Sequence, residues 1–581
     1  MISNCKLLIS LLLSAIAALS PVAASAASSP MHARHAMVVS INGFASAAGI
    51  EVLKRGGNAV DAAVAVGFAL AVVHPQAANI GGGGFMLLRL ASGDTHFIDF
   101  RETAPAAATE KMYQDAQGNL LSDASTIGYK AIAVPSSVAG LTYAQKKFGK
   151  LPLGTVMAPA IRMARYGFPL SFFDARDFRD DALAKFPESK RIFQTNRLHG
   201  GSYYEEGDTF RQPELARTLD RIARNPRDFY HGLLAKELVA AVQKGGGLLT
   251  AEDLGKYEVK ERPAVRGTYR GYEIIGAPPP SSGGVVMLEA LNILEPIPLA
   301  RMGSRSADSI HWTIEAFRRA YMDRADFLGD PDFSKLPVAQ LLDKKYAAQW
   351  RQTIDPLRAT PSAELKRPSF EDLDRQASMP SSMPRHESDQ TTHYSVVDKD
   401  GNAVAVTTTL NDSFGSRVVA GKLGFLLNDE MDDFASKPGA PNAYGLIQGP
   451  ANSIGPGKRP LSSMSPTMIL KDGKLLLVLG SPGGSRIIST VANILMGVVD
   501  YGLNIQEAVE AVRFHNQWMP DELGLEKVGI SPDTARLLEQ RGYKLNWSEP
   551  WSDGECIMID AASGERLGAS DPRNGGKALG Y

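Results

Sequence analysis

Cysteine is nearly absent from this chain: Cys5 and Cys556 are the two cysteines among 581 residues. Cys5 lies in a segment with the features of a removable export signal, so the mature chain would keep Cys556 alone and could form no internal disulfide. A site built from Cys-x-x-Cys ligands is excluded by the same count. An exported protein of this length must therefore be stabilised mainly by its hydrophobic core.

An excess of charge of one sign is also absent. Lys and Arg number 62, Asp and Glu number 63, and no run is rich in Lys or Arg. This balance argues against nucleic acid as the main partner. The motifs H-E-x-x-H, G-x-S-x-G and G-x-x-x-x-G-K-[ST] do not occur, so the signals of a zinc protease, a serine hydrolase elbow and a nucleotide phosphate loop are missing.

Long hydrophobic runs are scarce, and one of them lies at the N-terminus. Lys6 precedes a mainly apolar run from Leu7 to Leu19, which is shorter than the roughly 20 residues that span a bilayer. Ala24-Ser25-Ala26 then fits the small-residue rule for signal cleavage. We predict a signal peptide over residues 1–26 and a secreted, periplasmic protein. An uncleaved membrane anchor is the alternative, and no later segment is predicted to form a transmembrane helix.

Glycine and proline divide the chain into segments. Residues 46–53 and 59–73 are predicted helices, the second apolar on nearly all sides and so buried, and residues 85–88 form a buried strand after a four-glycine run. Residues 130–330 have mostly helical periodicity. Between residues 355 and 390 Pro, Ser, Asp and Arg dominate and the periodicity ends, which predicts a linker accessible to cleavage.

A β-hairpin is predicted immediately after this linker. Residues 393–397 and 403–407 alternate as strands do, and Lys399-Asp400-Gly401 provides a three-residue loop. With this loop, Thr391 lies opposite Thr409, and directly opposed residues have Cβ atoms ~5 Å apart. A slip of one residue would substitute a neighbour of Thr409. The register therefore predicts two threonine hydroxyls in contact at the start of the first strand.

A threonine hydroxyl becomes an effective nucleophile only with a base beside it. A threonine at a chain N-terminus supplies its own base, since an α-amino group has a pKa of about 7.7–8.0. Thr391 would gain this amine if the bond between Gln390 and Thr391 were cut. Taken alone, the hairpin favours an ordinary β-branched strand residue at this position.

A second candidate element is a strand, a glycine turn and a helix in succession. Residues 474–479 form the predicted strand, Gly480 to Arg486 the turn, and residues 487–499 the helix. Such a turn can present free backbone N–H groups, and those of Gly483 and Gly484 could bind the oxyanion of an acyl-transfer reaction. A purely structural turn and a phosphate loop are the alternatives.

The histidines are predicted to be structural. His32 and His35, near the mature N-terminus, should be exposed, and His515 should pack in the core. His393 shares the sheet face of Thr391, but no histidine base is needed where an α-amine has that role.

Many long motifs follow one another along the mature chain. In chain order they occupy residues 56–63, 81–85, 99–102, 278–284, 391–396, 401–411, 428–434, 458–466 and 480–486. Together they resemble the γ-glutamyltransferase family, bacterial type, of the N-terminal nucleophile hydrolases. The resemblance implies an α/β (α+β) fold of four αββα layers, built from both halves of a cleaved chain. It implies autocleavage at Gln390–Thr391 into a large subunit of residues 27–390 and a small subunit of residues 391–581, which form a heterodimer.

The resemblance also implies the catalytic parts. Thr391 matches the nucleophile and α-amine base, and Thr409 matches the residue that hydrogen-bonds the nucleophile, in agreement with the hairpin register. Gly483 and Gly484 match the oxyanion hole. Residues 438–449 resemble a lid loop, with Tyr444 over the pocket, which would shield an acyl-enzyme from water.

A γ-glutamyl group carries a free carboxylate and a free ammonium, and the resemblance provides residues for both. The carboxylate would be bound by the planar guanidinium of Arg101, helped by two matched hydroxyl residues, Ser462 and Ser463. The matched positions around the ammonium are Asn411, Glu430 and Asp433. Position 430 is Glu here, where related enzymes have Gln or Glu, which bears on donor preference.

The implied function is that of a γ-glutamyltransferase and glutathione hydrolase, acting on small-molecule donors and amino-acid or peptide acceptors. The resemblance implies no metal and no organic cofactor. Alternatives of the same fold are a glutaryl or cephalosporin acylase and a poly-γ-glutamate processing enzyme. An intact ammonium site disfavours the first, and a lid disfavours the second. A different class is an inactive periplasmic binding homologue, which should have lost Thr391 or the oxyanion glycines.

Overall fold

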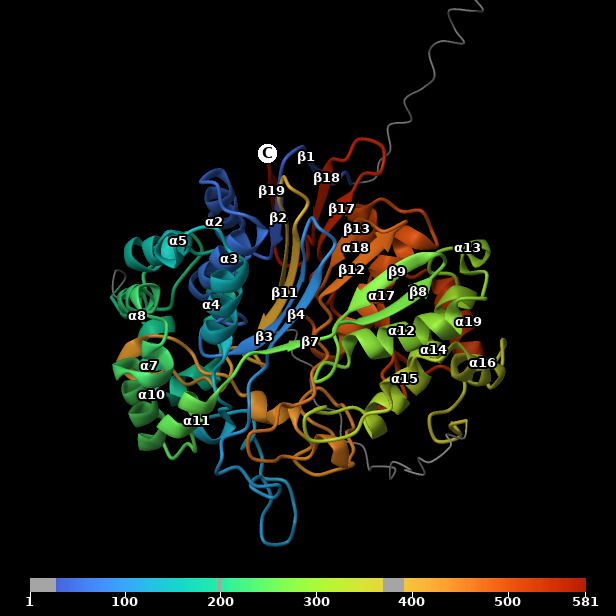
Figure 1. Cartoon of the computed structure of the whole chain (residues 1–581). Helices are drawn as coiled ribbons and strands as arrows, with labels where there is room; N and C mark the ends of the chain where they lie inside the picture. Colours follow the sequence, from blue (N-terminus) through green and yellow to red (C-terminus); the bar gives the residue numbers. More distant parts are fainter. Residues whose placement is uncertain (1–27, 197–199, 369–390) are drawn as a thin grey trace, which may run out of the picture.

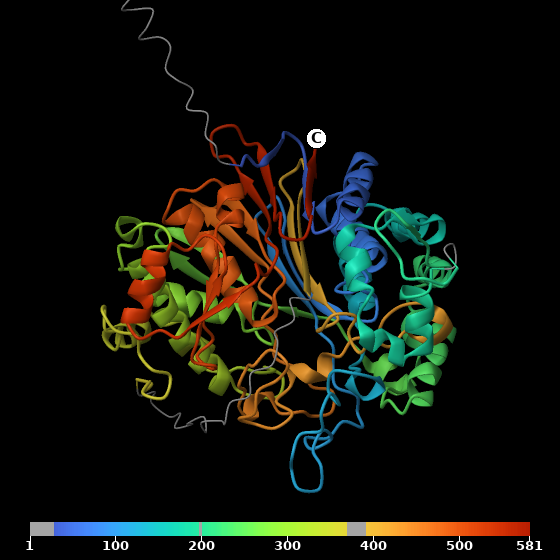
Figure 2. The same cartoon turned by 180° about the vertical axis from the view of Figure 1, so that it is seen from behind.

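The computed structural model describes residues 28–196, 200–368 and 391–581. Two seven-stranded sheets pack face to face, and helices cover the outer face of each sheet. Figure 1 shows the two sheets in the middle with a helical layer on either side, and Figure 2 shows the same layers from behind. The predicted four-layer αββα arrangement is confirmed.

Each sheet takes strands from both sides of residue 391, and all neighbouring strands pair antiparallel. Across the first sheet the order is β19 (Lys577–Gly580), β2 (Met37–Ser40), β10 (Thr391–Val397), β11 (Ala403–Thr409), β3 (Gly83–Arg89), β4 (Thr95–Phe100) and β7 (Lys260–Arg262). Across the second it is β1 (Met31–Ala33), β18 (Arg566–Ser570), β17 (Glu555–Ile559), β13 (Lys474–Leu479), β12 (Thr467–Lys471), β9 (Tyr272–Gly276) and β8 (Val265–Tyr269). The β10–β11 hairpin thus lies between β2 and β3.

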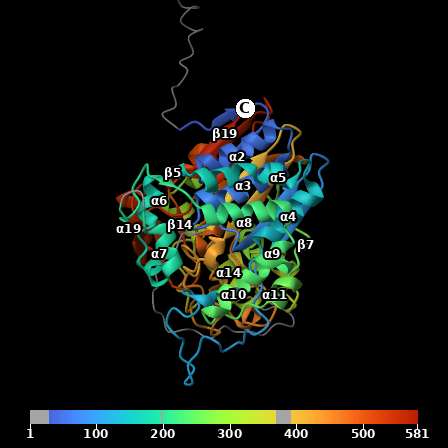
Figure 3. The same cartoon turned by 90° about the vertical axis from the view of Figure 1, so that its left-hand side faces the viewer.

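The helical layer seen face on in Figure 3 covers the first sheet. It contains α2 (Gly43–Lys54), α3 (Ala59–Val73), α4 (Ser137–Phe148), α5 (Leu153–Tyr166), α6 (Phe172–Asp177), α7 (Pro187–Phe193), α8 (Pro213–Arg224), α9 (Asp228–His231), α10 (Leu233–Lys244) and α11 (Ala251–Lys256). The opposite layer contains α12 (Gly283–Leu294), α13 (Leu299–Met302), α14 (Ala307–Phe327), α15 (Val338–Leu341), α16 (Lys344–Gln352), α17 (Ile487–Val499), α18 (Ile505–Glu510) and α19 (Pro532–Gln540).

Two small sheets complete the fold. One pairs β5 (Phe168–Pro169) with β6 (Thr209–Phe210), and the other consists of β14 (Phe514–His515), β15 (Leu523–Glu526) and β16 (Leu545–Ser548).

Alternation along β11 serves two cores at once. Val404 and Val406 pack in the cluster beneath the first helical layer, whereas Ala403 and Ala405 pack in the cluster shared with the second sheet. Successive side chains of a strand point to opposite faces, and both faces of this strand are covered. The hairpin that carries Thr391 is therefore held from both sides.

The two helices predicted near the N-terminus are present as α2 and α3. Helix α3 has the predicted bounds, all its residues are buried, and Asn58 caps its first turn by accepting hydrogen bonds from the backbone of Val60 and Asp61. Helix α2 begins three residues before the predicted start, at Gly43, because Asn42 caps it there. The prediction that residues 130–330 are mostly helical overlooked β7, β8 and β9, of which β7 and β8 lie at sheet edges. All three strands carry polar residues.

Two predicted cleavage points fall outside the described residues: the signal cleavage after Ala26, and Gln390 with most of the predicted linker. Among the residues that are described, no helix is long and apolar enough to cross a membrane.

Candidate active site

Thr391 is the first residue of β10, in the middle of the first sheet, and it is 5% exposed. It lies directly opposite Thr409 on β11, and the two Oγ1 atoms are 3.3 Å apart. The predicted register and the predicted contact of two hydroxyls are both confirmed. Thr409 Oγ1 also accepts a hydrogen bond from the backbone N–H of Asn411 at 2.9 Å, which orients it toward the strand start.

One pocket collects most of the predicted site residues. Its lining is Arg101, Thr391, Thr409, Asn411, Glu430, Asp433, Tyr444, Leu446, Ser462, Ser463, Met464, Gly484, Ser485 and Ile487. Ten of these were predicted from the sequence. Gly483 is the predicted site residue that the structure leaves outside this lining, although it adjoins Gly484.

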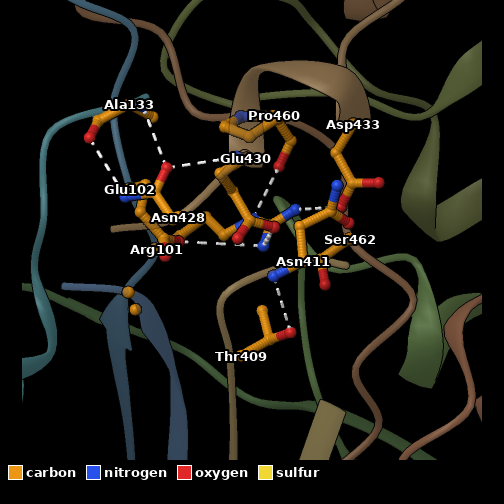
Figure 4. A network of polar contacts seen from close by, with 12 residues as sticks. Arg101, Glu102, Ala133, Thr409, Asn411, Asn428, Glu430, Asp433, Pro460 and Ser462 are labelled. Atoms are coloured by element: carbon orange, nitrogen blue, oxygen red, sulfur yellow. Dashed lines mark hydrogen bonds and ion pairs between the residues drawn. The ribbon is translucent and has the colours of Figure 1, made fainter. Parts of the chain in front are cut away.

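A buried guanidinium lies at the centre of the pocket's charged residues (Figure 4). Arg101 follows β4 directly and is fully buried. Its Nη1 donates to Glu430, its Nη2 donates to Asp433, and its Nε donates to the carbonyl of Pro460 at 3.2 Å. Glu430 and Asp433 come from one short 3-10 helix, Glu430–Asp433. Two residues expected to bind an ammonium are therefore paired with the residue expected to bind a carboxylate.

A third carboxyl, that of Glu102, lies behind this cluster, with Oε2 3.7 Å from Nη1 of Arg101. Burial, opposed by the Arg101 charge, raises the pKa of Glu102 from its ordinary value of 4.5 to about 7. Burial likewise raises the pKa of Glu430 well above its usual range, against the influence of Arg101. Three carboxyls around one guanidinium thus compete for a single positive charge.

Glu102 gives a testable consequence for stability. The folded protein holds its proton up to about pH 7, whereas the unfolded chain releases it near 4.5, so stability falls as the pH rises between these values. Glu102→Gln cannot ionise, and we expect it to lose roughly 1–3 kcal/mol less stability than wild type on going from about pH 5 to about pH 8.5. Melting temperatures at both pH values measure this, and parallel losses in the two proteins would contradict it.

The backbone of Ser462 is hydrogen-bonded to the segment that precedes α12. The N–H of Ser462 donates to the carbonyl of Pro280 at 2.8 Å, and its carbonyl accepts from the N–H of Ser282 at 2.7 Å. Ser463 lies beside them with an exposed fraction of 8%. Both serines, predicted to join Arg101, lie in the same pocket as Arg101.

The glycine turn between β13 and α17 has the predicted form. Gly483 has φ +129° and Gly484 has φ +53°, values that favour glycine. In the described part of the chain, no backbone hydrogen bond uses the N–H of either residue. Tyr321 on α14 donates its hydroxyl hydrogen to the carbonyl of Ser485, which fixes the turn to the helical layer that covers the second sheet.

The segment predicted to be a lid reaches the pocket, because Tyr444 and Leu446 belong to its lining. The hydroxyl of Tyr444 donates to the carbonyl of Asn411 at 2.7 Å, and only 4% of Tyr444 is exposed. Asp432 fixes the backbone of this segment, since its carboxylate accepts a hydrogen bond from the N–H of Ala443 at 2.9 Å. The same carboxylate accepts a hydrogen bond from the hydroxyl of Ser125 at 2.6 Å. The Tyr444 side chain is therefore fixed to the backbone of Asn411, in the pocket that Thr391 also lines.

The burial of the histidines agrees with the prediction that His515 is buried and that His32 and His35 are exposed. His393 is buried and its Nδ1 lies 2.8 Å from the hydroxyl of Thr407, while burial lowers its pKa to about 3. His515 is buried, and its Nδ1 lies 2.8 Å from the hydroxyl oxygen of Ser489. His32 and His35 are exposed.

Several residues that build the site were not singled out from the sequence. Asn428 links three segments, because its side chain bonds the carbonyls of Gly81 and Ala133 and the N–H of Ala133. Arg324 and Tyr321 reach the pocket walls from α14. The available signal was the charge density of α14, which carries seven Asp, Glu or Arg residues among its 21 residues together with large apolar side chains.

Comparison with known proteins decides the family. The family model described as Gamma-glutamyltranspeptidase matches residues 45–581. The chain belongs to the γ-glutamyltranspeptidase family. It is 49% identical over 574 residues to a glutathione hydrolase proenzyme of Pseudomonas sp. (strain A14), covering 96% of each protein. It is 49% identical over 549 residues to one of Escherichia coli (strain K12), covering 94% of this chain and 91% of that protein.

The fold extends to an acylase. The crystal structure of cephalosporin acylase from Bacillus halodurans has a TM-score of 0.80 at 27% identity, covering 97% of this chain and 98% of the acylase chain. The lower identity makes it a more distant relative of this γ-glutamyltranspeptidase family member than the two glutathione hydrolase proenzymes.

Proposed function

We propose that this protein is a γ-glutamyltransferase and glutathione hydrolase. It cleaves γ-glutamyl amides such as glutathione and glutamine, and passes the γ-glutamyl group to water, amino acids or peptides. The observation that carries the proposal is one pocket that joins Thr391 and Thr409 to a buried Arg101 flanked by Glu430 and Asp433. A donor with both a carboxylate and an ammonium matches these charges.

The nucleophile arises by self-processing. Thr391 Oγ1 attacks the carbonyl of Gln390 and the Gln390–Thr391 C–N bond breaks, which forms an ester and frees the α-amine of Thr391. Water then hydrolyses the ester and releases the Gln390 carboxylate and the Thr391 hydroxyl. The products are a large subunit of residues 27–390 and a small subunit of residues 391–581. The word proenzyme in the names of both relatives supports this step.

In catalysis the free α-amine accepts the hydroxyl proton as Thr391 Oγ1 attacks the γ-carbonyl of the donor. The N–H groups of Gly483 and Gly484 bind the developing oxyanion. Collapse of the intermediate expels the amine leaving group, which takes the proton. Water or an acceptor amine then attacks the γ-glutamyl ester of Thr391 and restores the enzyme.

Donor binding exchanges partners within the charged cluster. Arg101 releases part of its contact with Glu430 and Asp433 and takes the donor carboxylate, together with Ser462 and Ser463. The donor ammonium takes the carboxylates so freed, beside Asn411. No charge in the cluster is left without a partner, which would cost roughly a few kcal/mol. A glutaryl donor lacks the ammonium and leaves this exchange incomplete, so the acylase activity is the weaker candidate.

The test is a comparison of donors. Wild-type protein should release p-nitroaniline from γ-glutamyl-p-nitroanilide and release cysteinylglycine from glutathione, and it should act on glutaryl-p-nitroanilide at least roughly a hundredfold more slowly. A preference for the glutaryl donor would replace the proposed function with acylase activity. The export signal supports a periplasmic site of action, which cell fractionation with antibody detection tests.

Removing the lid ring should shift the reaction toward hydrolysis. Tyr444→Ala removes the ring that shields the acyl-enzyme from water, and we expect the ratio of transfer to hydrolysis to fall several-fold, about 3- to 10-fold, with a dipeptide acceptor. Tyr444→Phe keeps the ring and loses one hydrogen bond to Asn411, so its ratio of transfer to hydrolysis should lie between those of wild type and Tyr444→Ala. Product analysis measures the ratio. An unchanged ratio in Tyr444→Ala would rule out the shielding role.

A methyl group on the glycine turn should slow the chemical step. A Cβ at Gly483 would lie 2.1 Å from the Ser552 hydroxyl oxygen, at a φ that side chains rarely adopt. Gly483→Ala should therefore displace the oxyanion donors and lower kcat by roughly 10²- to 10³-fold with a smaller change in KM. Gly473→Ala is the matched control, since it has φ +75° but open space around its Cβ. Equal kcat values for the two variants would contradict the oxyanion role.

A further inference from the structure

Arg324 lies behind the two serines of the pocket, on helix α14, and is 1% exposed. Its Nε donates to the hydroxyl oxygen of Ser282 at 2.9 Å, and its Nη2 donates to the hydroxyl oxygen of Ser463 at 3.3 Å. Ser282 in turn donates its hydroxyl hydrogen to the carbonyl of Ser462 at 2.7 Å. A single guanidinium thus holds Ser463 directly and Ser462 through one intermediate.

The contact with Ser463 has a direction. A guanidinium can only donate hydrogen bonds, so the Ser463 oxygen accepts, and its own hydroxyl hydrogen must be donated elsewhere. Ser463 lines the pocket, where the occupant can supply an acceptor. An ionised carboxylate offers acceptors alone. Arg324 therefore sets Ser463 as a donor toward an anion.

The charge of Arg324 also favours an anion in the pocket. In the part of the chain that the structure describes, its Nη1 is buried without a hydrogen-bond partner. Burial lowers its pKa to about 10, against the opposing influence of Tyr321 and Asp433, so the group is still a cation at neutral pH. A buried cation without a carboxylate contact is costly, and an anion in the adjacent pocket would offset part of that cost. Arg101, in contrast, already contacts two carboxylates.

We propose that Arg324 is a positioning residue that makes the pocket selective for the α-carboxylate of the donor. It does so by fixing Ser463 as a hydrogen-bond donor, by holding Ser462 through Ser282, and by adding a second positive charge behind the carboxylate position. This inference rests on the proposed function, because it concerns the γ-glutamyl donor of that reaction.

The experiment compares two donors on processed enzyme. γ-Glutamyl-p-nitroanilide carries the α-carboxylate, and 4-aminobutyryl-p-nitroanilide lacks only that group; where the second is turned over too slowly, it is measured as a competitive inhibitor. Arg324→Met should raise KM for the first donor by roughly tenfold or more. It should leave the KM or inhibition constant of the second donor within about twofold of the wild-type value. Arg324→Lys keeps the charge but not the planar fork, so its effect should be smaller.

A pair of neighbouring serines supplies the matched control. Ser282→Ala removes the link between Arg324 and Ser462, and should shift the same donor ratio in the same direction. Ser281→Ala removes a buried hydroxyl that donates to the carbonyl of Met464 at 2.6 Å and does not contact Arg324, and should leave the ratio unchanged. If Arg324→Met fails to mature, Arg324→Lys and Ser282→Ala decide the question.

Three results would overturn the proposal: equal effects on both donors, no effect on either, or a shift in Ser281→Ala as large as in Ser282→Ala. These outcomes leave the proposed function intact, since wild-type enzyme would still cleave the γ-glutamyl donor. A wild-type enzyme without γ-glutamyl activity would instead remove the proposed function and this inference together, before any variant is compared.

Discussion

Thr391→Ala is expected to stay a single uncut chain, whereas wild type should yield two fragments, the smaller beginning Thr391-Thr392-His393. Without the hydroxyl there is no group to attack the carbonyl of Gln390, and without the cut there is no α-amine. Activity toward γ-glutamyl donors should fall by roughly 10⁴-fold or more, as it does when a catalytic nucleophile is removed. Intact mass and N-terminal sequencing measure the cleavage, and donor hydrolysis measures the activity.

The next residue of the strand is the control. Thr392 is fully buried, and its hydroxyl has no hydrogen-bond partner among the described residues; it also points to the opposite sheet face. Thr392→Val should therefore mature normally. Cleavage of Thr391→Ala at the same bond would mean that another group makes the cut. A wild-type chain that stays whole under all conditions would withdraw the assignment of an active enzyme.

Arg101→Met is expected to lower kcat/KM for γ-glutamyl donors by on the order of 10²- to 10³-fold, because it removes one partner of a buried, hydrogen-bonded charge cluster. The substitution leaves the carboxyls of Glu430 and Asp433 without their guanidinium and the donor carboxylate without its main partner. Steady-state kinetics with γ-glutamyl-p-nitroanilide measure the loss, and melting temperature shows whether the fold is weakened as well.

A donor without the α-carboxylate separates binding from folding. We expect 4-aminobutyryl-p-nitroanilide to lose much less activity in Arg101→Met, since its ammonium still finds Glu430 and Asp433. Arg101→Lys should be intermediate for the γ-glutamyl donor, because a single ammonium cannot form two parallel bonds. Equal losses for both donors would argue that Arg101 supports the pocket's shape and does not bind the donor carboxylate.

The part of the site that local chemistry dictates could be predicted from the sequence. A three-residue loop ending in Gly401 fixes the pairing of β10 and β11, and that pairing alone brings Thr391 to Thr409. The apolar run of α3 and the strand-turn-helix from β13 to α17 are likewise local patterns. The grouping of Arg101 with Ser462 and Asp433 required the family resemblance, since these residues lie far apart in the chain.

The remainder depends on tertiary contacts that no local pattern encodes. The charges of α14 are typical of an exposed helix, yet Glu315 and Arg319 are buried and pair with each other, and Arg324 is buried behind the pocket. The pairing of Glu430 with Arg101 could not be predicted either, because the family role of each residue refers to a bound donor. The edge strands β7 and β8, and β9 beside β8, were missed because their polar residues mask the alternation.

The sheets take strands from both proposed subunits, and this determines the lifetime of the folded protein after cleavage. The β10–β11 hairpin lies between β2 and β3, and β19 adds to the other side of β2, so the two proposed subunits share both sheets. They cannot part without breaking strand ladders inside the core, which amounts to global unfolding. Unfolding of the mature protein is then a first-order event, whereas its reversal requires two separate chains to meet and fold together. The working lifetime of the enzyme is accordingly set by the height of its unfolding barrier and not by a folding equilibrium.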